Sequence, residues 1–152
     1  MNRRELLLGG MALAGAAVVG RAQAAEMVHD HNMNMHEHHH AAPAYAALTV
    51  AIADCVQKGE VCLSHCLVLL GQGDKVMASC AQSVNQMLAV CNALQQLANQ
   101  DSKQVARLAS IAMDVCKQCE DECMKHADKH EQCKACGESC AACFKECKKV
   151  AA

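Results

Sequence analysis

Apolar residues recur at alternating steps of three and four in four segments of the chain between Pro43 and Val150. This spacing places the apolar positions of each segment along one face of an α-helix. Short polar or glycine-containing connections separate the segments, and helices joined in this way pack antiparallel to their neighbours. The pattern therefore predicts an all-α fold, an antiparallel up-down-up-down four-helix bundle over residues 44–152.

The predicted connections contain residues that commonly cap or end helices. In chain order they are Gly71–Gln72–Gly73 followed by Asp74, then Asn99–Gln100–Asp101, then Asp128–Lys129. The first helix is expected to begin after Pro43. The third is expected to run from about Ser102 to Ala127, and the fourth to end near Val150.

Each predicted helix has one stripe that faces the interior of the bundle. In chain order the stripes are Tyr45, Leu48, Ile52, Cys55, Gly59, Cys62, Cys66 and Leu69; Met77, Cys80, Val84, Met87, Cys91, Leu94 and Ala98; Val105, Ala109, Ala112, Cys116, Cys119, Cys123 and His126; and Cys133, Cys136, Cys140, Cys143 and Cys147. All 13 cysteines of the chain lie on these stripes. Thiols therefore occupy many positions that leucine would fill in an ordinary bundle.

The spacing of the cysteines disfavours disulfide bonds between neighbours on one stripe. Residues four apart on a helix have Cβ atoms about 5 to 6 Å apart, whereas a disulfide requires about 3.5 to 4.5 Å. A soft metal ion between two sulfurs would remove this misfit. The odd number of cysteines and the scarcity of turns also differ from disulfide-rich scaffolds, which are rich in loops.

The charge of buried thiolates favours Cu(I) as the metal. A tetrahedral zinc site with four cysteines carries a charge of −2, so about three such sites would place about −6 in the core. One Cu(I) per thiolate leaves no net charge, and Cu(I) prefers thiolate and thioether ligands. Multiple Cu(I) ions, about one per cysteine, are therefore predicted to bind to Cys55, Cys62, Cys66, Cys80, Cys91, Cys116, Cys119, Cys123, Cys133, Cys136, Cys140, Cys143 and Cys147.

Four Cys-x-x-x-Cys segments in helical register resemble those of the bacterial copper storage proteins. They are C-L-S-H-C at Cys62–Cys66, C-E-D-E-C at Cys119–Cys123, C-G-E-S-C at Cys136–Cys140 and C-F-K-E-C at Cys143–Cys147. The resemblance covers the chain after about Ala44 and includes a twin-arginine signal like that of the exported members. It implies a bundle that stores Cu(I) for copper-requiring enzymes or copper chaperones, and a homotetramer of such bundles.

Residues 1–24 have the features of a twin-arginine (Tat) export signal. The pair Arg3–Arg4 precedes an apolar run from Leu6 to Gly20, and Ala22–Gln23–Ala24 is a small-residue cleavage site. The apolar run has 15 residues, fewer than the roughly 20 that a membrane-spanning helix needs. We therefore expect cleavage after Ala24, export to the periplasm, and no attachment to the membrane afterwards.

Residues 25–43 are predicted to form a disordered arm rich in methionine and histidine. Its potential metal ligands are Met27, His29, His31, Met33, Met35, His36, His38, His39 and His40. Signal cleavage would remove three of the 14 basic residues and one of the 16 acidic residues, which changes the net charge from −2 to −4. A negative chain of this kind has no electrostatic basis for binding nucleic acid.

The two ends of the predicted bundle differ in composition. One end collects the apolar residues Tyr45, Leu48, Leu94, Val105 and Val150, whereas the other combines cysteines with the candidate secondary metal ligands His65, Met77, Met124, His126 and His130. Thioether and imidazole hold Cu(I) more loosely than a buried thiolate pair, so they can pass it inward. Copper is therefore predicted to enter at the histidine-containing end.

Other interpretations of the sequence remain open. The chain is also compatible with a disulfide-stabilised exported structural or binding protein, or with an iron–sulfur electron carrier, although it lacks the ferredoxin cysteine spacing. No Ser, His and Asp set or carboxylate pair lies where a cleft is predicted, so an enzyme is not expected. His65, His126 and His130 also fit a surface role, and Met87 and Met113 are expected to fill gaps in the core.

Overall fold

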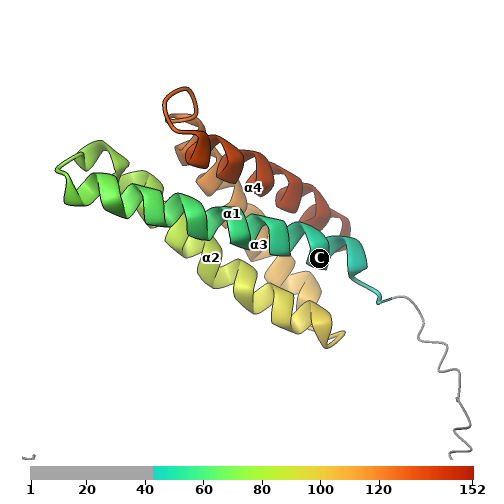
Figure 1. The fold of residues 1–152 in the computed structure, drawn as a ribbon. Helices are drawn as coiled ribbons and strands as arrows, with labels where there is room; N and C mark the ends of the chain where they lie inside the picture. The colour runs from blue at the N-terminus through green and yellow to red at the C-terminus, as the bar shows by residue number, and fades with distance from the viewer. Residues whose placement is uncertain (1–42) are drawn as a thin grey trace, which may run out of the picture. The chain divides into compact units, whose positions relative to one another are not determined.

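A computed structural model describes residues 43–152 of the chain. The helices are α1 (Ala46–Gly71), α2 (Ala78–Asn99), α3 (Val105–Met124) and α4 (Glu131–Val150), with a short 3-10 turn, η1 (Lys75–Met77), before α2. They form the predicted all-α four-helix bundle, and residues 43–152 contain no strand (Figure 1). The predicted export signal and nearly all of the predicted arm lie outside the described residues.

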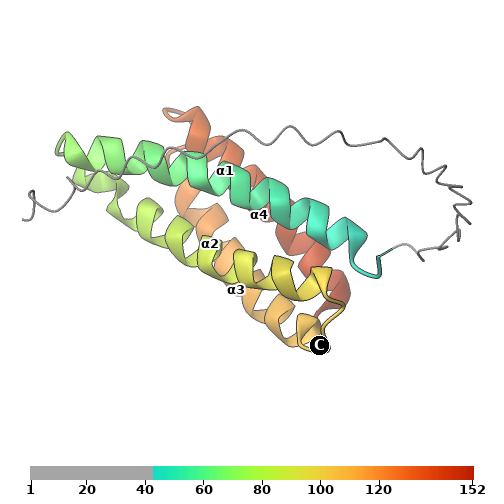
Figure 2. The ribbon, with the colours of Figure 1, turned by 60° about the horizontal axis from the view of Figure 1, so that its bottom comes forward.

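Each helix packs against two others, in the ring order α1, α2, α3, α4 and back to α1. Figures 1 and 2 show the α1–α2 and α3–α4 connections at one end of the bundle, with the α2–α3 connection and the C-terminus at the opposite end. We call the first the histidine end and the second the apolar end. Because the four stripes face the centre of the ring, they form one continuous core.

The α1–α2 connection is more structured than the single turn predicted from the sequence. Gly73 has φ +95°, a backbone conformation that glycine adopts readily because it lacks Cβ. The Asp74 carboxylate accepts a hydrogen bond from the Val76 N–H at 3.2 Å. Asp74 therefore caps η1, and α2 begins only at Ala78.

The start of α3 differs from the sequence prediction, because the helix begins at Val105 instead of near Ser102. Asp101 has φ +48°, outside the helical region. The Ser102 hydroxyl accepts a hydrogen bond from the Gln104 N–H at 3.2 Å. A serine side chain that bonds its own backbone in this way favours a turn over a helix.

The end of α3 also differs, since the helix ends at Met124 and not at Ala127. The His126 N–H donates to the Cys123 carbonyl at 3.0 Å, a shorter-range bond than the helical one. The His126 carbonyl then accepts a hydrogen bond from the His130 N–H at 3.0 Å. The resulting tight turn keeps His126 and His130 near each other at the histidine end.

The predicted stripes agree closely with the buried residues. All 13 cysteines are buried, as are the larger apolar residues Ile52, Val84, Leu94 and Val105. Tyr45, Leu69 and His126 are half-buried because they lie at or beyond the ends of helices.

Two buried serines lie outside the predicted stripes. The Ser83 hydroxyl donates to the Cys80 carbonyl at 2.9 Å, and the Ser139 hydroxyl donates to the Cys136 carbonyl at 2.8 Å. Each polar group is therefore satisfied within its own helix. They are the only polar side chains that are buried in residues 43–152.

Two pairs of helices approach each other closely at a glycine. A Cβ atom at Gly59 of α1 would lie 2.6 Å from Met87 Cε of α2, and one at Gly137 of α4 would lie 3.0 Å from Met124 Sδ of α3. Both positions therefore require a residue without a side chain, or displacement of the methionine. Met87 fills core space beside Gly59, in agreement with the packing role expected for it.

Candidate metal-binding core

The fold brings thiols from different helices within bridging distance of one another. The shortest Sγ–Sγ distances are 3.6 Å for Cys55–Cys140 and Cys80–Cys123, and 3.7 Å for Cys66–Cys80 and Cys91–Cys116. An S–S bond is about 2.05 Å long, and all 13 cysteines are free thiols. Separations of this size leave room for a metal ion between two sulfurs, because a zinc–thiolate bond, for example, is about 2.3 Å.

The sulfurs gather into four groups whose members all lie within 4.8 Å of one another. Two are groups of four, which we call the four-helix tetrad (Cys55, Cys91, Cys116 and Cys143) and the histidine-end tetrad (Cys62, Cys66, Cys80 and Cys133), and two are groups of three (Cys62, Cys123 and Cys136; Cys119, Cys136 and Cys140). These groups include 12 of the 13 cysteines. The remaining one, Cys147, has its sulfur 4.0 Å from that of Cys143.

Hydrogen bonds among the thiols make some of them easier to ionise than others. Cys123 and Cys133 donate to Cys80, which lowers the pKa of the Cys80 thiol. The pKa of Cys62 is raised, chiefly because its bonds to Cys123 and Cys133 favour its protonated form. Within one group, the first thiolate therefore forms where neighbouring thiols can donate to it.

No buried cation in residues 43–152 compensates the charge of these thiolates, since Ser83 and Ser139 are the only buried polar side chains there. Uncompensated thiolates in an apolar core are strongly unfavourable. The fully ionised cysteine set therefore needs positive charge from outside the protein, and bound metal cations supply it.

The structure brings together three of the five candidate secondary ligands. His65 Nε2 lies 3.0 Å from His130 Nδ1, and the rings of His126 and His130 have centroids 6.5 Å apart. All three histidines are half-buried. Met77 is 1% exposed and packs in the core, whereas Met124 is 46% exposed and lies over Gly137.

The opposite end of the bundle contains no such groups among the described residues. Leu48, Leu94 and Val105 are buried there, as the sequence predicted. The chain terminus folds onto α3, where the Ser110 hydroxyl donates to the Ala152 carbonyl at 3.1 Å. This end is closed by hydrocarbon and backbone, so the two ends differ as expected.

Sequence reasoning did not place Met87 near the metal ligands. The Cys55 thiol donates to Met87 Sδ at 3.4 Å, so a thioether lies beside the four-helix tetrad. The stripe position of Met87 was the only signal in the sequence, and it indicates burial without indicating a neighbour.

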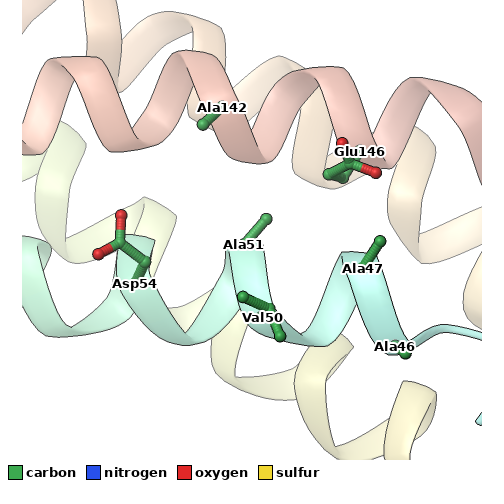
Figure 3. A pocket seen from close by; sticks show the side chains of 7 residues that line it. All are labelled: Ala46, Ala47, Val50, Ala51, Asp54, Ala142 and Glu146. Atoms are coloured by element: carbon green, nitrogen blue, oxygen red, sulfur yellow. The ribbon is translucent and has the colours of Figure 1, made fainter.

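A surface hollow lies between α1 and α4, away from the sulfurs (Figure 3). Its lining is mostly apolar and consists of Ala46, Ala47, Val50, Ala51, Asp54, Ala142 and Glu146. It has only two carboxylates and no cysteine or histidine, so it is not a soft-metal site.

No helix in residues 43–152 has the length and hydropathy needed to cross a bilayer.

Comparison with known proteins agrees with the chemistry of the core. The model of a family described as copper storage protein (Csp) matches residues 38–152. YhjQ, described as an uncharacterized cysteine-rich protein of Bacillus subtilis (strain 168), is 26% identical over 102 residues, which cover 67% of this chain and 91% of that protein. The family match includes every residue that the structure describes.

Solved structures share the fold. Copper storage protein 3 from Bacillus subtilis in its apo form has a TM-score of 0.62 at 26% identity, covering 70% of this chain and 98% of that one. Cu(I)-bound BsCsp3 has a TM-score of 0.62 at 24% identity, and the match covers 70% of this chain and 97% of that one. Ccsp from Streptomyces lividans, loaded with 10 copper equivalents, has a TM-score of 0.64 at 24% identity, and the match covers 70% of this chain and 82% of that one.

The family model spans about three quarters of the chain and includes all 13 cysteines. The resemblance inferred from the four Cys-x-x-x-Cys segments is therefore confirmed. With four helices, a thiol-lined interior and a match over residues 38–152, this chain belongs to the copper storage protein family.

Proposed function

We propose that this chain stores Cu(I) inside the bundle, at about one ion per cysteine, and later supplies it to copper-requiring enzymes or copper chaperones. The observation that carries the proposal is the arrangement of 12 thiols in adjoining groups, in a core to which residues 43–152 contribute no buried cation. One monovalent ion per thiolate neutralises such a core, and Cu(I) is the soft ion that prefers thiolates. Copper bound to the related BsCsp3 and Ccsp structures is consistent with this role.

All 13 cysteines are the proposed ligands. His65, Met77, Met124, His126 and His130 are proposed as secondary ligands at the histidine end, where Cu(I) would first be captured. The histidines at this end are half-buried and so remain in contact with solvent. We assign the chain a storage role and no catalytic one.

Export to the periplasm by the Tat pathway is part of the proposal and depends on residues 1–24. A family relative from Streptomyces lividans is described as cytosolic, so membership of the family does not by itself indicate a compartment. The Arg3–Arg4 pair and the Ala22–Gln23–Ala24 cleavage site support export of this chain. After cleavage the protein would be free of the membrane.

A homotetramer is proposed from the family resemblance. The exposed apolar residues Val50, Val61 and Val68 of α1 offer surface for contact between bundles. Such residues on an otherwise polar helix face are compatible with burial in an assembly.

Counting thiols in the metal-free protein tests the proposed function against its alternatives. The reduced, unfolded chain should contain 13 reactive thiols. The folded protein should then take up Cu(I) without a change in helical circular dichroism, because the ligands are already in place. A thiol count near zero before reduction would support the disulfide-stabilised alternative, and a brown protein as isolated would support an iron–sulfur carrier.

Replacing His126, His130 and Met77 together by leucine should slow the loading and the removal of copper while leaving most of the capacity. The reason is that these three side chains lie in the two connections at the histidine end, and none of them belongs to the histidine-end tetrad. Stopped-flow measurement of Cu(I) transfer from and to a chelator gives both rates. Met113→Leu, a half-buried methionine within α3, is the matched control. Unchanged rates, or copper entering beside Tyr45 in partly loaded crystals, would place the entrance elsewhere.

A further inference from the structure

The geometry points to a second class of cargo. We infer that the metal-free bundle binds two divalent ions that favour four thiolates, of the Zn²⁺ and Cd²⁺ type, one in the four-helix tetrad and one in the histidine-end tetrad. The inference concerns sites for single divalent ions and does not depend on copper storage.

The sulfur separations in the tetrads fit tetrahedral coordination. A zinc ion with four Zn–S bonds of about 2.3 Å requires its sulfurs to be about 3.8 Å apart. In the histidine-end tetrad, Cys66–Cys80 is 3.7 Å and Cys62–Cys133 is 3.8 Å. These two pairs share no residue, so they form opposite edges of the tetrahedron.

The four-helix tetrad has the same character. Its Cys91–Cys116 edge is 3.7 Å, and all its sulfurs lie within 4.8 Å of one another. It takes one cysteine from each of the four helices, so a bound ion would join the whole ring. Rotation of the cysteine side chains can shorten the longer sulfur–sulfur distances in both tetrads. Each of these distances has to fall by no more than about 1 Å to reach the roughly 3.8 Å of a tetrahedral site.

The number of ions follows from how the groups overlap. The two tetrads have no cysteine in common, whereas one of the triads shares Cys62 with the histidine-end tetrad. Within residues 43–152 the remaining groups offer only three sulfurs each. The cysteines outside the tetrads that these triads contain, Cys119, Cys123, Cys136 and Cys140, do not all lie within 4.8 Å of one another. A third divalent ion would therefore have no preformed group of four thiolates unless it took Cys62 from a filled site.

Neighbouring thiols can stabilise the charge of the two filled sites. Each binding step takes one M²⁺ and four thiols, releases four protons to solvent and leaves a site with a charge of −2. The Cys140 sulfur lies 3.6 Å from that of Cys55, and the Cys123 sulfur lies 3.6 Å from that of Cys80. The Cys147 sulfur lies 4.0 Å from that of Cys143. These protonated thiols can donate hydrogen bonds to the bound thiolates, which supports the ligands from outside the coordination shell.

Titration of the full reduced, metal-free protein with Cd²⁺ tests the inference. The thiolate-to-cadmium charge-transfer absorption should saturate at two ions per chain, and ¹¹³Cd NMR should show two tetrathiolate resonances. Cadmium bound only by histidines gives neither the thiolate-to-cadmium absorption nor a tetrathiolate resonance. Binding to the histidines of the chain therefore does not add to the number of ions counted by these two signals. Saturation at zero, at one, or at three or more ions would overturn the inference.

Double serine variants assign the two sites. Cys91→Ser with Cys116→Ser should remove one ion and one resonance, and Cys66→Ser with Cys80→Ser should remove the other. Cys119→Ser is the matched control, because Cys119 belongs to neither tetrad and its sulfur lies next to those of Cys123 and Cys136, which are also outside both tetrads. This variant should still bind two Cd²⁺ ions. Circular dichroism checks that each variant is folded. An equal loss of Cd²⁺ binding in the Cys119→Ser control would overturn the assignment.

The same preparations separate this inference from the proposed function. Cu(I) added to the cadmium-loaded protein should displace both Cd²⁺ ions, since one Cu(I) per thiolate removes the residual negative charge. Uptake of about 13 Cu(I) without thiolate-bound Cd²⁺ would overturn only the divalent sites. Binding of two Cd²⁺ with no capacity for more than two Cu(I) would overturn copper storage and leave these sites standing.

Discussion

Titration of the metal-free protein with Cu(I), in competition with a chelator, is expected to saturate near 13 ions per chain. The physical reason is charge, because the core has 13 thiols and no buried cation in the described residues. Each Cu(I) that replaces a thiol proton leaves the core neutral, so uptake can continue until the thiols are used. The chelator absorbance at each addition gives the stoichiometry. Saturation at three or four ions would instead mean that each ion takes several thiolates, which would contradict one Cu(I) per thiolate.

Removal of one tetrad provides a quantitative check on this capacity. Replacing Cys55, Cys91, Cys116 and Cys143 by serine should reduce the Cu(I) capacity by about four ions. Met87→Leu is the matched control, because it changes packing next to Cys55 without removing a thiol. Its capacity should be unchanged. An equal fall in both variants would mean that packing, and not the number of thiolates, limits uptake.

Ile52→Ala is expected to destabilise the metal-free bundle by about 2 to 5 kcal/mol, the usual range for an aliphatic residue truncated in a core. Ile52 is fully buried with the apolar residues that hold the helices together in the absence of metal. We therefore expect the metal-free protein to be helical and the variant to unfold at lower denaturant concentration. Circular dichroism during urea unfolding measures the free energy of unfolding for both.

The control for this prediction lies on the same helix. Val50 is 71% exposed, so Val50→Ala should change the free energy of unfolding by no more than about 0.5 kcal/mol. Loading with Cu(I) should raise the stability of every variant, because ligands that bind only the folded state stabilise it. A random-coil spectrum for the metal-free protein, or equal effects of Ile52→Ala and Val50→Ala, would contradict the prediction.

Local features of the sequence account for the helices and for the burial of the cysteines. Steps of three and four are a property of a single helix, so Cys133 and Cys147 can be assigned to one face without knowledge of any partner. The boundaries of α3 were less predictable. Ser102 bonds to the Gln104 backbone and not to a helix, and side-chain competition of this kind is hard to foresee from periodicity.

Only the tertiary structure decided which sulfurs meet. Periodicity places Cys91 and Cys116 on inward faces, but their 3.7 Å separation depends on how α2 and α3 are rotated and shifted along their axes. The same holds for the contact between His65 and His130, 65 residues apart. A residue's helical face is set by neighbours within a few positions, whereas the axial position of one helix against another is set by packing over the whole core. The sequence by itself therefore determined the bundle and its thiol lining, and the packing of the helices determined the tetrads.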